Sequence, residues 1–305
     1  MNIENYLTIV ALEDGLTAKL SRNACEYCVD GDGNWKALTA NTNTEAINTG
    51  QTLSFRGNLT PASSKGIGRF TISKSCNLEG NCMSMLFGDD AVDNNSLSGK
   101  DYAFYQLFGW CSLIKSVSSG FLPATTLAES CYKDMFLYGN NLITTPELPA
   151  TTLASSCYES MFSNCTSLTT APELPATSLS KSCYDGMFQY CTSLTTAPAL
   201  PAITLASNCY NSMFQGCSSL TQAPELPATT LISNCYYYMF SGCSKLSYIK
   251  AMFTTTPSTS YTNNWVEGVA SSGTFVKNSN ATWNVTATSS NYYIGIPSGW
   301  TVQTA

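Results

Sequence analysis

The chain has no histidine and few charged residues, and these shortages argue against chemistry. Charged residues make up only 11% of its 305 residues. Without histidine, general acid-base work would fall on carboxylates or cysteines. The repeat glutamates, such as Glu147 and Glu173, form a spaced row and not a converging pair, and a cysteine nucleophile would lack its base. The composition therefore predicts a protein that is not an enzyme.

Two further shortages limit the partners. The formal net charge is −6, and no basic stripe is visible that could neutralise phosphates, so we expect no nucleic-acid partner. No apolar run approaches the ~20 residues that span a bilayer, so we expect no membrane insertion. The segment Met1–Tyr6 has none of the features of an export signal. We therefore expect the chain to be made in a cytoplasm and to stay there or leave by lysis, unless a signal has been trimmed.

What the chain does contain is one motif repeated at a fixed spacing. The segment Leu122–Leu127, Leu-Pro-Ala-Thr-Thr-Leu, recurs with small changes every 26 residues, and each copy is followed by Cys-Tyr-x-x-Met-Phe. A fixed period of this length indicates an array of stacked units. Each unit has apolar residues that only a neighbouring unit can cover, so the copies are expected to share one continuous core.

Within one repeat the pattern predicts a short helix followed by a short strand. Cys157 and Met161 stand at i and i+4, which would place them on one face of a helix over residues 155–162. Residues 167–170 fit a short strand. The prolines that follow, Pro172 and Pro175, forbid helix and favour an extended turn. We therefore predict a leucine-rich-repeat solenoid over residues 99–250, with a short strand and a short helix in each repeat.

The two ends of the chain do not share the period. Residues 1–98 contain short turn-separated strands, which predict an antiparallel β-sandwich domain. Residues 251–305 combine a few strands with large aromatic side chains, which predict a C-terminal β cap over the last repeat. The expected fold class is therefore α+β.

The 14 cysteines fit core packing better than a disulfide framework. Ten of them, from Cys111 onward, fall in register with the repeats. Gly139 takes the second cysteine position in the first full repeat, so no disulfide is obligatory to every repeat. Cysteine packs well as a small apolar residue, and we expect mostly free thiols.

Two motifs in the first 98 residues have a metal-binding interpretation and a plainer one. Asp30–Asn34 resembles the start of a calcium loop, but Asn41 replaces the acid that such a loop needs at its twelfth position. A zinc site would have to use four cysteines, Cys25, Cys28, Cys76 and Cys82. We favour a plain turn in the first case and strand packing or an incidental disulfide in the second, with no metal and no cofactor.

The repeats vary at two positions after each Cys-Tyr and at two after each Phe. On a short helix these positions would point outward, where tyrosines can stack on sugars or anchor a protein. The plainer interpretation is drift at solvent-exposed sites. The candidate recognition surface comprises Tyr138, Tyr190, Tyr237, Tyr238, Lys133, Asp134, Glu159, Asp185 and Asn211.

The repeat resembles the BspA-like leucine-rich repeat. Cys157, Tyr158 and Met161 take the Ile, Gly and Ala places of that motif. Four further residues match it directly, namely Phe162, Cys165, Ser167 and Leu168. The resemblance covers about residues 100–250. Residues 56–60 and 81–89, together with 273–277 and 296–302, are similar to whole proteins of gut anaerobes and of the tailed phages that infect them.

This resemblance implies a non-enzymatic surface role, and three functions remain open. The first is a phage virion component, a fibre or a tail- or head-associated protein. Its N-terminal domain would bind other virion proteins, and its array would contact a host surface protein or glycan. The second is a bacterial cell-surface adhesin or glycan-binding protein. The third is a purely architectural part. The missing export signal and low charge favour the first, located in the virion, and a homo-oligomer is compatible with it.

Overall fold

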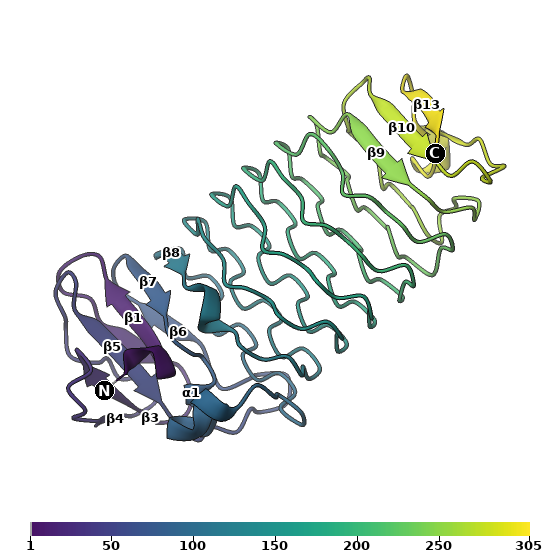
Figure 1. The fold of residues 1–305 in the computed structure, drawn as a ribbon. Helices are drawn as coiled ribbons and strands as arrows, with labels where there is room; N and C mark the ends of the chain where they lie inside the picture. The colour runs from purple at the N-terminus through teal and green to yellow at the C-terminus, as the bar shows by residue number, and fades with distance from the viewer. Residues whose placement is uncertain (1) are drawn as a thin grey trace.

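The computed structural model describes residues 2–305 and shows an elongated molecule with its termini at opposite ends (Figure 1). The chain winds along the long axis, and each 26-residue repeat makes one turn of the winding, which we call a coil. The elements before the full repeats are η1 (Ile3–Asn5), β1 (Leu7–Ala11), β2 (Ala18–Leu20), β3 (Cys25–Val29), β4 (Lys36–Leu38), β5 (Thr52–Arg56), β6 (Phe70–Ile72), β7 (Cys76–Glu79), α1 (Ser84–Phe87), η2 (Gly88–Asp93), β8 (Ile114–Val117) and η3 (Ser119–Phe121). Those after them are β9 (Tyr248–Ala251), β10 (Thr274–Lys277), β11 (Thr286–Ala287), η4 (Ser289–Asn291), β12 (Ile296–Pro297) and β13 (Thr301–Thr304).

The N-terminal part is built around one six-stranded sheet in the order β4-β3-β5-β1-β7-β8. Its first five strands pair antiparallel, but β7 pairs parallel with β8, which lies beyond residue 98 in the first coil. The predicted antiparallel sandwich is therefore wrong. The sheet continues into the repeats, and the remaining strands of this part, β2 and β6, form a separate antiparallel pair.

The repeats contain consecutive turns where short helices were predicted. Across residues 2–305 the one α-helix is α1, which precedes the full repeats. In the second full repeat every fourth residue of the turn segment has a positive φ, with values of 51° at Ser156, 53° at Ser160 and 62° at Asn164. A right-handed helix needs φ near −60° at every residue, so a left-handed residue at every fourth position ends it repeatedly.

The hydrogen bonds explain why this conformation is stable. Alternate amides stay within their own turn, as when Met161 N donates to Tyr158 O at 3.2 Å. The amides between them donate to the next coil, as when Ser160 N donates to Asp185 O at 2.8 Å. Both sets are satisfied, as buried backbone groups require. The fold class α+β, with a helix-bearing leucine-rich-repeat solenoid, is therefore wrong, because the repeats are made of turns and small strands.

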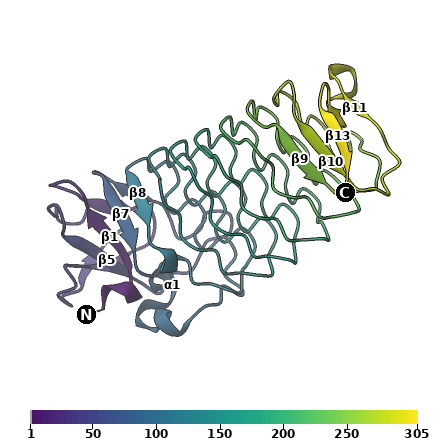
Figure 2. The ribbon, with the colours of Figure 1, turned by 45° about the horizontal axis from the view of Figure 1, so that its top comes forward.

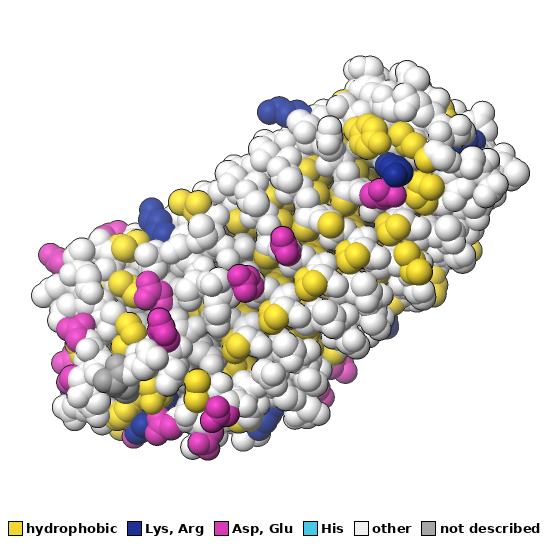
Figure 3. Space-filling model, in the orientation of Figure 1, with side chains coloured by type: hydrophobic (Ala, Val, Ile, Leu, Met, Phe, Trp, Pro, Cys, Tyr) yellow, Lys and Arg dark blue, Asp and Glu magenta, His cyan; other side chains and the backbone are white. Residues whose placement is uncertain are grey.

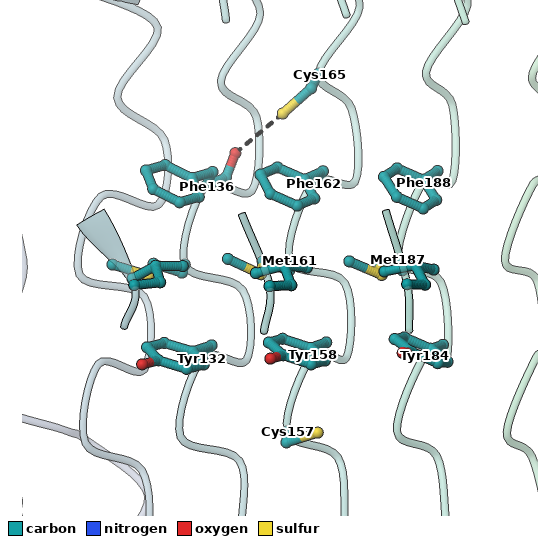
Figure 4. Close-up of a cluster of buried hydrophobic side chains, with 14 of the residues drawn as sticks. Tyr132, Phe136, Cys157, Tyr158, Met161, Phe162, Cys165, Tyr184, Met187 and Phe188 are labelled. Carbon is teal, nitrogen blue, oxygen red and sulfur yellow. Dashed lines mark hydrogen bonds between the residues drawn. The ribbon is translucent and has the colours of Figure 1, made fainter. Parts of the chain in front are cut away.

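The core of the stacked coils consists of side-chain ladders that run along the long axis. Figure 4 shows tyrosine, methionine and phenylalanine repeating from coil to coil. The rings of Phe136, Phe162 and Phe188 are parallel, with centroids 5.6 and 5.9 Å apart. The tyrosine ladder has the same character, with 5.8 Å between Tyr132 and Tyr158. Each ring is covered on both faces by its neighbours, so no coil can bury its core alone.

The other sides of each coil are extended chain with little strand structure. Isolated parallel bridges join neighbouring coils, for example Thr152 to Ser178 and Thr170 to Thr196. Regular parallel strands develop only near the C-terminal end, where the order is β13-β10-β9 (Figure 2). The prolines of the Pro-Glu-Leu-Pro segments lack the amide that a longer ladder would need, which accounts for the sparse pairing beside them.

Non-repeated aromatic residues close both ends of the ladders. Phe70 of β6 stacks on Phe108 at 5.4 Å and so covers the first ring of the phenylalanine ladder. At the far end, Trp265 lies 6.2 Å from Phe240 and 5.8 Å from Phe253. Its indole N–H donates to Gly295 O at 2.9 Å, so the buried ring has no unpaired polar group.

All 14 cysteines are free and buried, in agreement with the prediction of thiols as core filler. The second cysteine of a coil also donates to the preceding coil, as when Cys165 Sγ donates to Phe136 O at 3.3 Å (Figure 4). Cys25 and Cys28 on β3 are separated from Cys76 on β7 by two intervening strands, or roughly 14 Å at ~4.8 Å per strand, which is too far for one zinc ion. Asp30–Asn34 is a turn in which Asp32 accepts from Asn34 N at 2.8 Å.

Candidate recognition surface

All nine predicted recognition residues lie on the same side of the molecule. They occupy the outward positions of the turn segments, which we call the turn face. The turn face consists of residues 105–106, 109–110, 133–134, 137–138, 159–160, 163–164, 185–186, 189–190, 211–212, 215–216, 237–238 and 241–242. The four-residue period of the turns points two residues inward and the next two outward, so the variable pairs after Cys-Tyr and after Phe share one face.

The charged candidates are largely engaged with one another. Lys133 Nζ lies 2.6 Å from Glu159 Oε1, and both side chains are about three-quarters buried. Asp134 is buried and accepts a hydrogen bond of 3.1 Å from Gln106. Asp185 accepts one of 3.3 Å from Asn211 on the next coil. These four side chains therefore link neighbouring coils and offer few free groups to a ligand.

Burial alters the acidity of two of these carboxyl groups. It is the main cause that raises the pKa of Asp185 to about 7, and the neighbouring Glu159 carboxylate adds to the effect. Burial also raises the pKa of Asp134, while the hydrogen bond from Gln106 acts in the opposite direction. Near neutral pH a substantial fraction of Asp185 is therefore protonated, which lessens its repulsion of Glu159.

The aromatic candidates are the most accessible part of the turn face. Tyr138 and Tyr190 are 43% and 44% exposed, and both have left-handed backbone with φ of 60° and 58°. Tyr237 and Tyr238 are half-buried and pack edge-to-face at 4.7 Å. The Tyr238 hydroxyl also accepts from Asn264 at 2.9 Å. Only Tyr138 and Tyr190 therefore present much ring surface to a partner.

Trp110 belongs to the same row and was missed by the sequence reasoning. It is 48% exposed, its φ is 60°, and its ring stacks on Tyr138 at 6.3 Å. It precedes Cys111 as Tyr190 precedes Cys191, and this was the available signal. The first coil is offset from the second by 28 residues, from Trp110 to Tyr138, and the 26-residue period does not reach it.

Tyr138 and Tyr190 flank a position that carries no ring. Asn164 occupies this row in the coil between them, and ladder spacings of 5.6 and 5.9 Å separate the outer two coils by about 11–12 Å. On the far side of Tyr190 the row continues with Gly216. A Cβ at Gly216 would lie 2.3 Å from Tyr190 Cδ1, so the glycine leaves room for that ring. The arrangement gives two aromatic rings with an amide side chain between them.

The Pro-Glu-Leu-Pro side of the coils has a different character. Figure 3 shows a row of hydrophobic side chains there with isolated acidic ones, and charged residues are sparse over the whole pictured face of the repeats. Glu147 and Glu173 line a shallow pocket with the prolines around them. Glu225 pairs with Lys250 at 3.0 Å. The spacing of these acids follows the coils, and the pairing with Lys250 occupies one of them.

Within residues 2–305, no cluster of three or more potential metal-binding side chains occurs, and none of the helices has the length and apolar character of a membrane span. Comparison of the chain with protein-family models, with curated proteins and with solved structures gave no match.

Proposed function

We propose that the protein is a non-enzymatic recognition and structural protein that contacts a host surface through its turn face. The observation that carries this proposal is the row of exposed aromatic rings at left-handed positions, Trp110, Tyr138 and Tyr190. Left-handed backbone costs a non-glycine residue ~1–2 kcal/mol, and the same row has Gly216 and Gly242 in other coils. The fold therefore does not require aromatic residues there, whereas a binding role would favour them.

The stacked coils would present these rings with little freedom. Tyr138 N and Tyr190 N donate to the next coil at 2.9 and 2.7 Å, which fixes the backbone beneath each ring. A preorganised surface loses less conformational entropy when it binds than a flexible loop does. The spacing of the rings is therefore suited to a partner that carries regularly spaced groups, such as a surface glycan, or to a protein with a flat contact area.

The setting that fits this role best is a virion. In this proposal the protein is a fibre or a tail- or head-associated component, made in the host cytoplasm. Its N-terminal part binds other virion proteins and its turn face meets a host surface protein or glycan. The second candidate is a bacterial cell-surface adhesin or glycan-binding protein, which would use the same aromatic row.

Binding of the purified protein to cells and envelope fractions of gut anaerobes tests the proposal. The informative variants are Tyr138→Asn and Tyr190→Gly, because the array itself carries Asn164 and Gly216 at these positions. Ile203→Ala is the matched control, since Ile203 is 72% exposed and lies outside the turn face. We expect each tyrosine change to weaken binding about tenfold, as the loss of an aromatic anchor does, and the control to have no effect.

Two results would contradict the proposal. One is that the unaltered protein fails to bind any of these cells at micromolar concentration. The other is that Ile203→Ala weakens binding while the tyrosine variants bind normally, which would move recognition to another face. Isolation of the protein from purified phage particles, as opposed to bacterial outer membranes, would distinguish the virion role from the adhesin role.

A further inference from the structure

A pocket with three basic side chains lies at the N-terminal end of the turn face. Its volume is about 540 Å³, and its lining includes Arg22, Lys65 and Arg69. The whole chain has only 14 lysines and arginines against 20 acidic residues. Three exposed cations at one pocket are therefore a local reversal of the overall charge, and an electrostatic field of this kind attracts anions.

Within the described residues, none of these three cations forms an ion pair. The acidic residues of the adjacent turn face are engaged, because Asp134 accepts from Gln106 and Glu159 pairs with Lys133. Arg69 is placed by the indole of Trp110, with its guanidinium carbon 5.4 Å from the ring centroid. The arginine thus connects the basic pocket to the aromatic row.

The backbone around the pocket is held in place by three segments that contact one another. Ser21 N donates to Arg69 O, and Arg69 N donates to Ser21 Oγ, both at 2.9 Å. Phe70 N donates to Leu107 O at 2.7 Å, which joins the loop to the first coil. Gly66 has φ of +58°, and a Cβ there would lie 2.7 Å from Tyr102 O. The cations therefore project from a fixed frame and not from a free loop.

The rest of the lining is polar and suited to hydroxyl groups. Ser21, Ser64, Tyr105 and Gln106 contribute side-chain hydroxyls and an amide. The Tyr105 hydroxyl accepts from Gln106 at 2.7 Å, which leaves its own hydrogen available to donate. Such a lining does not favour an acyl chain, and three cations are too few to follow a nucleic-acid backbone.

From these observations we infer that the pocket binds an acidic saccharide residue, with its carboxylate or sulfate group held by Arg22, Lys65 and Arg69. The neighbouring sugar hydroxyls bond to the serine, tyrosine and glutamine side chains, and the chain of sugars continues toward Trp110 and Tyr138. Guanidinium groups recognise such oxyanions through paired hydrogen bonds. This inference rests on the proposed recognition role of the turn face and names the chemical class of its ligand.

Titration calorimetry with the full chain and three oligosaccharides tests the inference. The probes are a hexuronate oligomer, a sulfated oligomer and the neutral oligomer of the same length. We expect at least one charged probe to bind at least tenfold more tightly than the neutral one, with an affinity that falls as NaCl rises. Binding of both charged probes indicates general oxyanion recognition, and binding of one alone identifies the anion.

Variants separate the pocket from the rest of the turn face. Arg69→Gln and Lys65→Gln should each weaken binding of the charged probe about fivefold, the effect of ~1 kcal/mol per exposed charge pair. Lys74→Gln is the matched control, because Lys74 is exposed and outside the pocket. Thermal unfolding of each variant checks that the fold is intact.

Three results would overturn the inference: equal binding of neutral and charged probes, equal effects of Arg69→Gln and Lys74→Gln, or equal competition by a polyglutamate peptide. If one of these occurs while Tyr138→Asn and Tyr190→Gly still weaken cell binding, the ligand class is wrong and the recognition face stands. If the tyrosine variants also bind normally, the proposed function fails as well.

Discussion

Replacement of Gly216 by alanine should destabilise the protein more than the same change at Gly242. Both glycines have left-handed backbone, with φ of +74° and +78°. A Cβ at Gly216 would lie 2.3 Å from Tyr190 Cδ1, whereas one at Gly242 would be 3.4 Å from the nearest atom, which is Gly216 Cα. The two positions therefore share the backbone cost and differ in the clash with Tyr190.

The magnitudes follow from these two terms. Left-handed backbone costs an alanine ~1–2 kcal/mol relative to glycine, so Gly242→Ala should lower the free energy of unfolding by about that amount. At Gly216 the ring of Tyr190 must also move away, and overpacking of this kind costs a further ~1–3 kcal/mol. We therefore expect a total of ~2–5 kcal/mol for Gly216→Ala.

Equilibrium urea unfolding, followed by tryptophan fluorescence and circular dichroism, measures both changes. The decisive measurement is a double-mutant cycle with Tyr190→Gly. In that background the ring is absent, so Gly216→Ala should cost no more than Gly242→Ala does. Equal costs for the two single glycine variants, or a cost of Gly216→Ala that persists without the Tyr190 ring, would refute the placement of this ring against the next coil.

Two further predictions concern ionisable groups. The folded-state pKa of Asp185 is about 7, above the value near 3.9 of an unfolded chain, so its contribution to stability is complete below pH ~4 and is lost as pH rises through 7. Asp185→Asn should therefore be more stable than the unaltered protein above pH 7, by ~1 kcal/mol after solvent screening, and about equal at pH 4, and urea unfolding at both values would expose an error. Burial raises the pKa of Cys131, Cys183, Cys191 and Cys243 to about 12, so native protein at pH 8 should resist iodoacetamide and stability should fall above pH ~9. Mass spectrometry should find 14 alkylated cysteines only after unfolding, and a majority of oxidised cysteines would contradict the thiol ladder.

The sequence identified the inward residues of the repeats but assigned them the wrong backbone. Cys157 and Met161 do share a buried face, as an i, i+4 pair on a helix would. The consecutive turns have a period of four residues, so the same spacing satisfies both conformations. The discriminating signal was weak: the left-handed positions hold Asn164, Gly186 and Gly216, which tolerate positive φ, but also serines and tyrosines, which do not announce it.

Two other errors have a common cause in contacts that the repeat period does not specify. The parallel pairing of β7 with β8 crosses from the non-repeated part into the first coil, and no local pattern indicates it. Trp110 was missed because the first coil is two residues longer than the others. The candidate residues were placed on one face correctly, but their pairing, such as Lys133 with Glu159, depends on side-chain rotamers across neighbouring coils.

The hydrogen-bond pattern of the turns explains why this array needs unlike ends. Alternate amides of a turn segment bond only to the next coil, so the amides of the last coil would be left unpaired and its aromatic rings uncovered. The chain meets this need with residues from outside the period: Asn264 N donates to Tyr292 O at 2.6 Å, and Trp265 covers Phe240. At the other end Phe70 covers Phe108. Since each coil is stabilised only by its neighbours, damage to either end should unfold coils progressively from that end, and the aromatic row should remain ordered only while both ends are intact.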